Sequence, residues 1–232
     1  MPTGQDHTVK AFDDDIGQLR GLISQMGGLA EQAIGDAMTA LQRADVVLAR
    51  KVRDNDKAID AIEAEVERLT VRVIALRAPM ADDLREVVAA LKIAAVIERI
   101  GDYAKNIAKR VPEIHIGEDR IEPVSILPAM AHLAADMVHD VLDAFSARDA
   151  DAALEVCRRD SALDDFYNSI FRALVTYMVE NPKTISQVAH LLFVAKNLER
   201  IGDHATNVAE MVYFAATGRY LTDRDVGEGG LP

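Results

Sequence analysis

Two acidic motifs in the sequence repeat almost letter for letter. ERIGDYAKN spans 98–106 and ERIGDHATN spans 199–207, an offset of 101 residues. Each motif places Glu, Asp and Asn at positions i, i+4 and i+8, so on a helix two carboxylates and an amide share one face. Like charges at this spacing destabilise a helix by roughly 0.2–0.5 kcal/mol. Each motif therefore needs a compensating positive charge.

A second acidic pair accompanies each motif: DKAID spans 56–60 and DSALD spans 160–164. If each pair and its motif lie on the two helices of an antiparallel hairpin, residues equidistant from the turn share one level, because both helices rise by about 1.5 Å per residue. The pairs are equidistant from Pro79 in the first hairpin and from a point beside Pro182 in the second. The spacing predicts two carboxylate clusters: Asp56, Asp60, Glu98 and Asp102, and Asp160, Asp164, Glu199 and Asp203.

Two kinds of positive charge could balance these clusters. Neighbouring side chains could form a salt-bridged surface, and the candidates are Arg99, Arg200, Lys57 and Lys105. Alternatively, each cluster binds a metal ion. A lone acidic pair is usually a solvated face, but four pairs in matched register favour metal binding. All-oxygen ligation suits hard or borderline cations, so the candidates are iron, manganese, magnesium and zinc.

The helices that must position these residues are evident from the hydrophobic periodicity. Apolar residues recur at helical spacing, as in Ile59, Ile62 and Val66, and no strand-like alternation occurs. Prolines and a glycine interrupt the pattern at 79 and over 111–128. We expect helices near 15–43, 46–77 and 82–110 in one half, and near 124–147, 150–180 and 183–217 in the other. The fold class is therefore all-α.

The two halves are copies of one unit. At an offset of 104 residues, Met26 matches Met130 and Asp36 matches Asp140, whereas the later motifs match at 101. Three residues are thus missing from the second copy, and the turn between its second and third helices is the simplest place for that difference. The sequence predicts two tandem three-helix bundles. Their boundaries are 1–112 and 129–220, with a linker and the start of the following helix at 113–128 and a flexible tail at 221–232.

Smaller features bear on the predicted clusters. Gly101 and Gly202 interrupt helices, which indicates close contact with a neighbouring helix. His204 follows Asp203, but its counterpart is Tyr103, so it is not a duplicated ligand. The lone Cys157 cannot form an intrachain disulfide and is typical of a small buried hydrophobic residue in a reducing compartment.

Composition narrows the classes of partner. The chain of 232 residues has 38 acidic and 26 basic residues, a net charge of −12, which argues against binding to nucleic acid. No N-terminal targeting pattern is present, and the most apolar segment, 87–97, is interrupted by Lys92 and too short to insert into a membrane. These features predict a cytoplasmic protein.

With these motifs in place, the chain resembles the PhoU family of bacterial phosphate-uptake regulators. The resemblance rests on RAPMADDLREVVAALKIAAVIERIGDYAKNIAKR and its echo HLLFVAKNLERIGDHATNVAE. It covers nearly the whole chain and includes both repeats and their acidic pairs.

The resemblance implies a non-enzymatic cytoplasmic regulator that restrains the phosphate-starvation response when phosphate is plentiful. The implied partners are the ATPase subunit of the phosphate ABC transporter and a phosphate sensor histidine kinase. Members are typically homodimers with multinuclear metal clusters, which here would contain iron or zinc, with manganese or magnesium as alternatives. Carried over by position, the eight carboxylates above would be the metal ligands, and the resemblance implies no catalytic residue.

Two other functions are compatible with parts of the sequence. A di-metal carboxylate oxidase or ferroxidase would carry Glu-x-x-His motifs on two helices, and the chain has none. A metal-free helical scaffold would use the acidic pairs only as a solvated face. Chelation followed by metal analysis separates the scaffold from the other two functions, and oxygen-dependent turnover separates the enzyme from the regulator.

Overall fold

The computed structural model describes residues 4–114, 121, 125–222 and 225–226. These residues form six long α-helices with short 3-10 helices beside them, and no strand occurs among them. The elements in chain order are α1 (Gly4–Arg43), α2 (Val46–Arg77), α3 (Asp82–Ala108), η1 (Val111–Glu113), α4 (Leu127–Ala147), α5 (Ala150–Glu180), η3 (Pro182–Thr184) and α6 (Ile185–Thr217).

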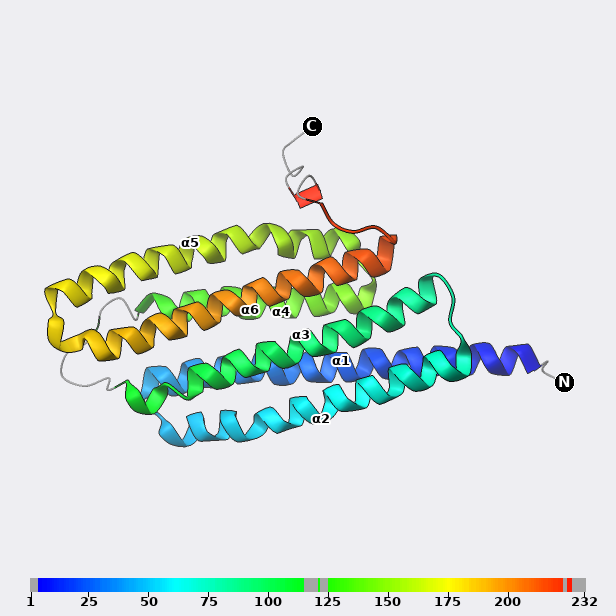
Figure 1. Ribbon diagram of the computed structural model, residues 1–232, viewed down its shortest axis with the longest axis horizontal. Helices are drawn as coiled ribbons and strands as arrows, with labels where there is room; N and C mark the ends of the chain where they lie inside the picture. Colours follow the sequence, from blue (N-terminus) through cyan, green and yellow to red (C-terminus); the bar gives the residue numbers. More distant parts are fainter. Residues whose placement is uncertain (1–3, 115–120, 122–124, 223–224, 227–232) are drawn as a thin grey trace.

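The helices pack as two three-helix bundles, α1–α3 and α4–α6, lying side by side (Figure 1). Between the bundles, α3 packs against α6 and α1 against α4, while α2 and α5 lie at opposite outer edges. The predicted all-α fold of two tandem three-helix bundles is confirmed. In the described part of the chain, no helix combines the length and apolar character that a membrane span requires.

The first turn of each bundle is built in the same way. Ala44 and Arg148 both adopt left-handed backbone conformations, with φ of 52° and 56°. The next residues, Asp45 and Asp149, cap the following helices: the Asp45 carboxylate accepts a hydrogen bond from the Leu48 amide at 2.9 Å, and Asp149 accepts from two amides at 3.0 Å. These turns are 104 residues apart, as the first part of the repeat predicts.

The second turns lie where the prolines predicted them. Residues 78–81, including Pro79, join α2 to α3, and Asn181 with η3 joins α5 to α6. The first helix is longer than expected: α1 begins at Gly4, about three turns before residue 15, and no proline interrupts the chain there. The predicted linker and tail lie largely outside the described residues.

A continuous hydrophobic core runs through both bundles. Its largest fully buried side chains include Ile23 and Met26 from α1, Ile97 and Ile100 from α3, and Met130 from α4. Full burial of one such side chain contributes about 1.5–3 kcal/mol. The core therefore holds α3 and α6, the two helices that carry the repeated motifs, in fixed register.

A buried ion pair crosses between the bundles. Glu86 on α3 is only 6% exposed, and it pairs with Arg20 of α1 at 2.5 Å and with Arg148, after α4, at 2.8 Å. Two guanidinium groups satisfy the buried carboxylate, which would otherwise be costly to desolvate. Nothing in the sequence repeat signals this contact, because the counterpart of Glu86 is Gln187.

The two motif glycines allow close helix contact, as predicted. A Cβ atom at Gly101 would lie 2.7 Å from Ile59 Cδ1, and one at Gly202 would collide with Leu163 Cδ2. Both apolar partners are buried on the facing helix of the hairpin. The same Cβ positions would lie in ordinary van der Waals contact, at 3.7 Å, with the Oδ1 atoms of Asp56 and Asp160, so each glycine is next to an acidic residue of the facing helix.

We expect Gly202→Ala to lower the free energy of unfolding, because overpacking costs about 1–3 kcal/mol and outweighs the gain in helix propensity of up to about 1 kcal/mol. The matched control is Gly35→Ala on α1, where no atom lies within 4 Å of the added Cβ, and this change should stabilise the protein. Urea denaturation of both variants measures the difference. Equal effects at the two positions would contradict the close-packing role of Gly202.

Candidate metal centre

The first carboxylate cluster lies between α2 and α3. Burial raises the pKa of Glu98, and so do the charges of Asp102, Glu63, Asp60 and Asp56. All four predicted members of this cluster therefore lie within electrostatic reach of one another across the hairpin. The contact of Gly101 with Ile59 also agrees with the predicted register of α2 against α3.

A lysine sits inside this first cluster. The Lys105 ammonium donates to Asp56 of α2 and to Asp102 of α3, so it bridges the two helices. Burial alone would lower the pKa of Lys105, but the hydrogen bonds to Asp102 and Asp56 raise it above its ordinary value. Of the compensating side chains that the sequence offered, Lys105 makes these contacts, whereas no ion pair of the described residues involves Lys57.

The second cluster lies between α5 and α6 and is more compact. One oxygen each of Asp164, Glu199 and Asp203 lie within 4.8 Å of one another, a separation that a single metal ion can span. Burial and then the charges of Asp164, Asp203 and Glu199 raise the pKa of Asp160 to about 6. The fourth predicted member therefore interacts electrostatically with the other three. Among the residues that the structure describes, no trio in the first repeat meets the same distance limit.

Glu199 is the least solvated carboxylate of the second cluster. The residue is 8% exposed, and its Oε1 atom accepts from Lys196 on the same helix. Its Oε2 atom is buried and has no hydrogen-bond partner among the described residues. An unpartnered buried carboxylate oxygen is costly, so it marks a place for a cation or another donor.

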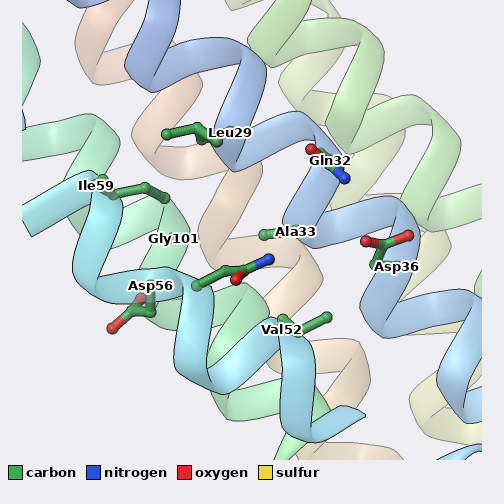
Figure 2. A pocket seen from close by; sticks show the side chains of 9 residues that line it. Leu29, Gln32, Ala33, Asp36, Val52, Asp56, Ile59 and Gly101 are labelled. Carbon is green, nitrogen blue, oxygen red and sulfur yellow. The ribbon is translucent and has the colours of Figure 1, made fainter. Parts of the chain in front are cut away.

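Next to the first cluster, a small cavity lies between side chains of α1 and α2 (Figure 2). Its volume of about 20 Å³ is enough for one water molecule. Gln32 and Asp36 of α1 line the cavity opposite Val52 of α2, while the carboxylate of Asp56 points away from α1. The Asp56 carboxylate is thus directed to the α2–α3 side, where its Oδ2 atom accepts a hydrogen bond from Lys105.

The seam between α3 and α6 separates the two clusters. Tyr103 and His204, which are repeat equivalents, meet there edge to face with ring centroids 5.1 Å apart. His204 Nδ1 lies 2.8 Å from the carbonyl oxygen of Arg200, and burial lowers the pKa of the imidazole. A hydrogen bond to Tyr103 also raises the pKa of Arg200. His204 is therefore held at the seam between α3 and α6, in contact with Tyr103 and the Arg200 carbonyl.

Sequence reasoning missed two charged neighbours of the clusters. Glu63, one turn after Asp60, adds a fifth carboxylate near Glu98, and the i, i+3 spacing on α2 could have signalled it. Lys196 precedes Glu199 by three residues and also lies 5.0 Å from the centre of the Tyr167 ring. Neither residue is duplicated: the counterparts are Tyr167 for Glu63 and Ala95 for Lys196.

Known proteins match this chain along most of its length. The sequence profile of the PhoU domain matches twice, over residues 23–111 and 127–212. The phosphate-specific transport system accessory protein PhoU homolog of Zymomonas mobilis is 54% identical over 222 residues, which cover 96% of this chain and 93% of that protein. The homolog of Caulobacter vibrioides is 45% identical over 219 residues, covering 94% and 95%.

Solved structures match the fold equally well. PhoU from Pseudomonas aeruginosa superposes with a TM-score of 0.85 at 37% identity, covering 90% of this chain and 100% of that one. The phosphate transport system regulatory protein PhoU from Streptococcus pneumoniae gives a TM-score of 0.84 at 25% identity, covering 91% and 99%. With both repeats matched by the profile and relatives aligned over nearly their full length, the chain belongs to the PhoU domain family.

Proposed function

We propose that the chain is a non-enzymatic regulator of phosphate uptake that binds metal ions at its two carboxylate clusters. The family membership and the names of the relatives support the role in phosphate transport. Two observations at the second cluster carry metal binding: one oxygen each of Asp164, Glu199 and Asp203 lie within 4.8 Å of one another, and Glu199 has a buried oxygen without a hydrogen-bond partner among the described residues.

The proposed ligands are the eight carboxylates that the register brings to the two hairpins. Oxygen donors alone suit hard or borderline cations, so the proposed metals are iron or zinc, with manganese or magnesium as alternatives. A bound cation would supply the positive charge that the second cluster needs, since Lys196 engages only one oxygen of Glu199. The Glu-x-x-His ligands of di-metal oxidases are absent from the sequence, so a regulatory metal site is the better proposal.

The proposed partners follow from the transport role. As a transport accessory protein, the chain would act in the cytoplasm on the ATPase subunit of the phosphate transporter and on the phosphate sensor kinase, as a homodimer and a negative regulator. Its net charge of −12 supports protein partners over DNA.

Replacing Glu199 and Asp203 by Gln and Asn should remove metal from the second cluster, because two of four negative ligands are lost while the shape is kept. Chelation should lower the melting temperature of the wild type, since metal at about a hundred times its dissociation constant adds roughly 2.7 kcal/mol of stability. Mass spectrometry of metal content and melting curves with and without chelator measure both effects. Glu210→Gln, an exposed change on the same helix, is the control. Unaltered metal content in the double variant would rule out this site.

Asp160 gives the chelated protein a defined pH dependence. Its pKa is about 6 in the fold against an ordinary value of 3.8, so the folded state binds this proton more tightly. The charged form therefore destabilises the fold above about pH 6, and this penalty disappears as the pH falls toward the ordinary value. Asp160→Asn should raise the melting temperature of the chelated protein at pH 7.5, and the difference from wild type should shrink at pH 5. A difference that grows toward pH 5 would contradict the assignment.

The regulatory role is tested in cells. A strain that lacks the gene should express a phosphate-starvation reporter even in phosphate-rich medium, and the wild-type gene should restore repression. The Glu199→Gln, Asp203→Asn variant should restore it less well if metal is needed, whereas Glu210→Gln should act as wild type. A deletion strain with normal repression would overturn the regulatory proposal whatever the metal content of the purified protein.

A further inference from the structure

The two clusters differ in what occupies the space between their carboxylates. In the first, the Lys105 ammonium contacts one carboxylate from each helix of the hairpin. At the equivalent position of the second repeat stands Thr206. The Thr206 hydroxyl donates to the backbone carbonyl of Asp203 at 2.7 Å, so it places no charge among the second set of carboxylates.

Lys196 of the second cluster does not perform the same role as Lys105. It contacts Glu199, three residues away on its own helix, and its ammonium also lies over the Tyr167 ring. It is the more exposed of the two lysines, with 39% of its side chain accessible against 25% for Lys105. Asp164 and Asp203 form no ion pair among the described residues.

We propose that Lys105 is a built-in cation that competes with metal at the first cluster, so that the second cluster binds metal more tightly. This inference rests on the proposed metal-binding function and adds a difference between its two sites. The ammonium holds one oxygen of Asp56 and one of Asp102, so a metal ion that uses these oxygens must displace it, and one that uses the remaining oxygens meets its positive charge. Because Lys105 is attached to the same helix as Asp102, it is present at the cluster at all times and competes as an intramolecular ligand.

A simple count of charges leads to the opposite expectation. The first cluster has a fifth carboxylate, Glu63, where the second repeat has Tyr167. If the number of acids governed affinity, the first cluster would bind metal more tightly. The internal cation thus predicts tighter metal binding at the second cluster, whereas the number of acids predicts tighter binding at the first. Measuring the affinity of each cluster decides between them.

The test measures Mn²⁺ affinity one cluster at a time in the full chain. Glu199→Gln with Asp203→Asn leaves only the first cluster, and Glu98→Gln with Asp102→Asn leaves only the second. Free Mn²⁺ is counted by electron paramagnetic resonance during titration of the chelated and dialysed protein. We expect the second cluster alone to bind at least about tenfold more tightly than the first alone, which corresponds to about 1.4 kcal/mol.

Exchanging the two equivalent residues should move the affinities in opposite directions. In the chain that keeps the first cluster, Lys105→Thr should tighten Mn²⁺ binding at least about tenfold. In the chain that keeps the second cluster, Thr206→Lys should weaken it by a similar factor. Lys105→Met, which retains the length of the side chain without its charge, provides a second variant, and circular dichroism reports whether each chain folds.

The control for net charge is Lys109→Thr. Lys109 lies one turn beyond Lys105, is exposed, and donates to Asn106 at 3.0 Å. The Lys109→Thr substitution should leave the Mn²⁺ affinity of the first cluster nearly unchanged, although it removes the same charge as Lys105→Thr. An equal gain from Lys109→Thr and Lys105→Thr, or no gain from Lys105→Thr and Lys105→Met, would overturn the inference while leaving metal binding intact. A wild type that binds no Mn²⁺, Zn²⁺ or iron would overturn the proposed function and the inference with it.

Discussion

The main constraint on this structure is the repulsion between carboxylates, because the hairpin register brings acidic side chains of two helices to one level. In each bundle two helices carry acidic pairs at i, i+4 spacing, and the antiparallel hairpin sets one pair against the other. The perturbed acidity of Glu98 and Asp160 is the direct consequence, because each group loses water and faces several like charges. A nearby positive charge reduces this repulsion, and the structure places Lys105 at the first cluster and Lys196 at the second.

Apolar packing forces the carboxylates together. Ile59 and Leu163 press against Gly101 and Gly202 so closely that a Cβ at either glycine would require their side chains to shift. The burial of these apolar residues holds the helices at a spacing that the charges alone would oppose. Since the glycines are neighbours of Asp102 and Asp203 in the chain, the same contact fixes the height of the acidic pairs. The favourable free energy of apolar burial thus offsets the repulsion between the carboxylates of each cluster.

Duplication explains why the clusters resemble each other, and later divergence explains why they differ. The turns at Ala44 and Arg148, the aspartate caps and the motif glycines are common to both copies. The charges around the clusters are not: Lys105, Glu63 and Lys196 have a threonine, a tyrosine and an alanine as counterparts. The repeat therefore preserves the backbone geometry and the eight acids, while the surrounding charges set the properties of each cluster separately.

The sequence by itself determined the helical class, the duplication, the hairpin turns and the level at which the acids meet. These features depend on periodicity, helix-breaking residues and a constant rise per residue, all of which are local and can be counted along the chain. The start of α1 escaped prediction: the helix begins at Gly4, about three turns before the expected residue 15. Which side chains compensate the acids was also left open, since Lys57, Lys105 and both motif arginines all lie within three residues of a cluster acid.

Only the tertiary structure decided those questions. In the folded chain Lys105 pairs with Asp56, which is 49 residues away along the sequence. The fold also leaves one oxygen of Glu199 buried without a hydrogen-bond partner among the described residues. It also joined Glu86 to Arg20 and Arg148, a contact across three helices that no repeat or period encodes. The physical reason is that the partner of a charged side chain depends on its rotamer, its burial and the packing angle of the helices. These are fixed only when the whole core has assembled.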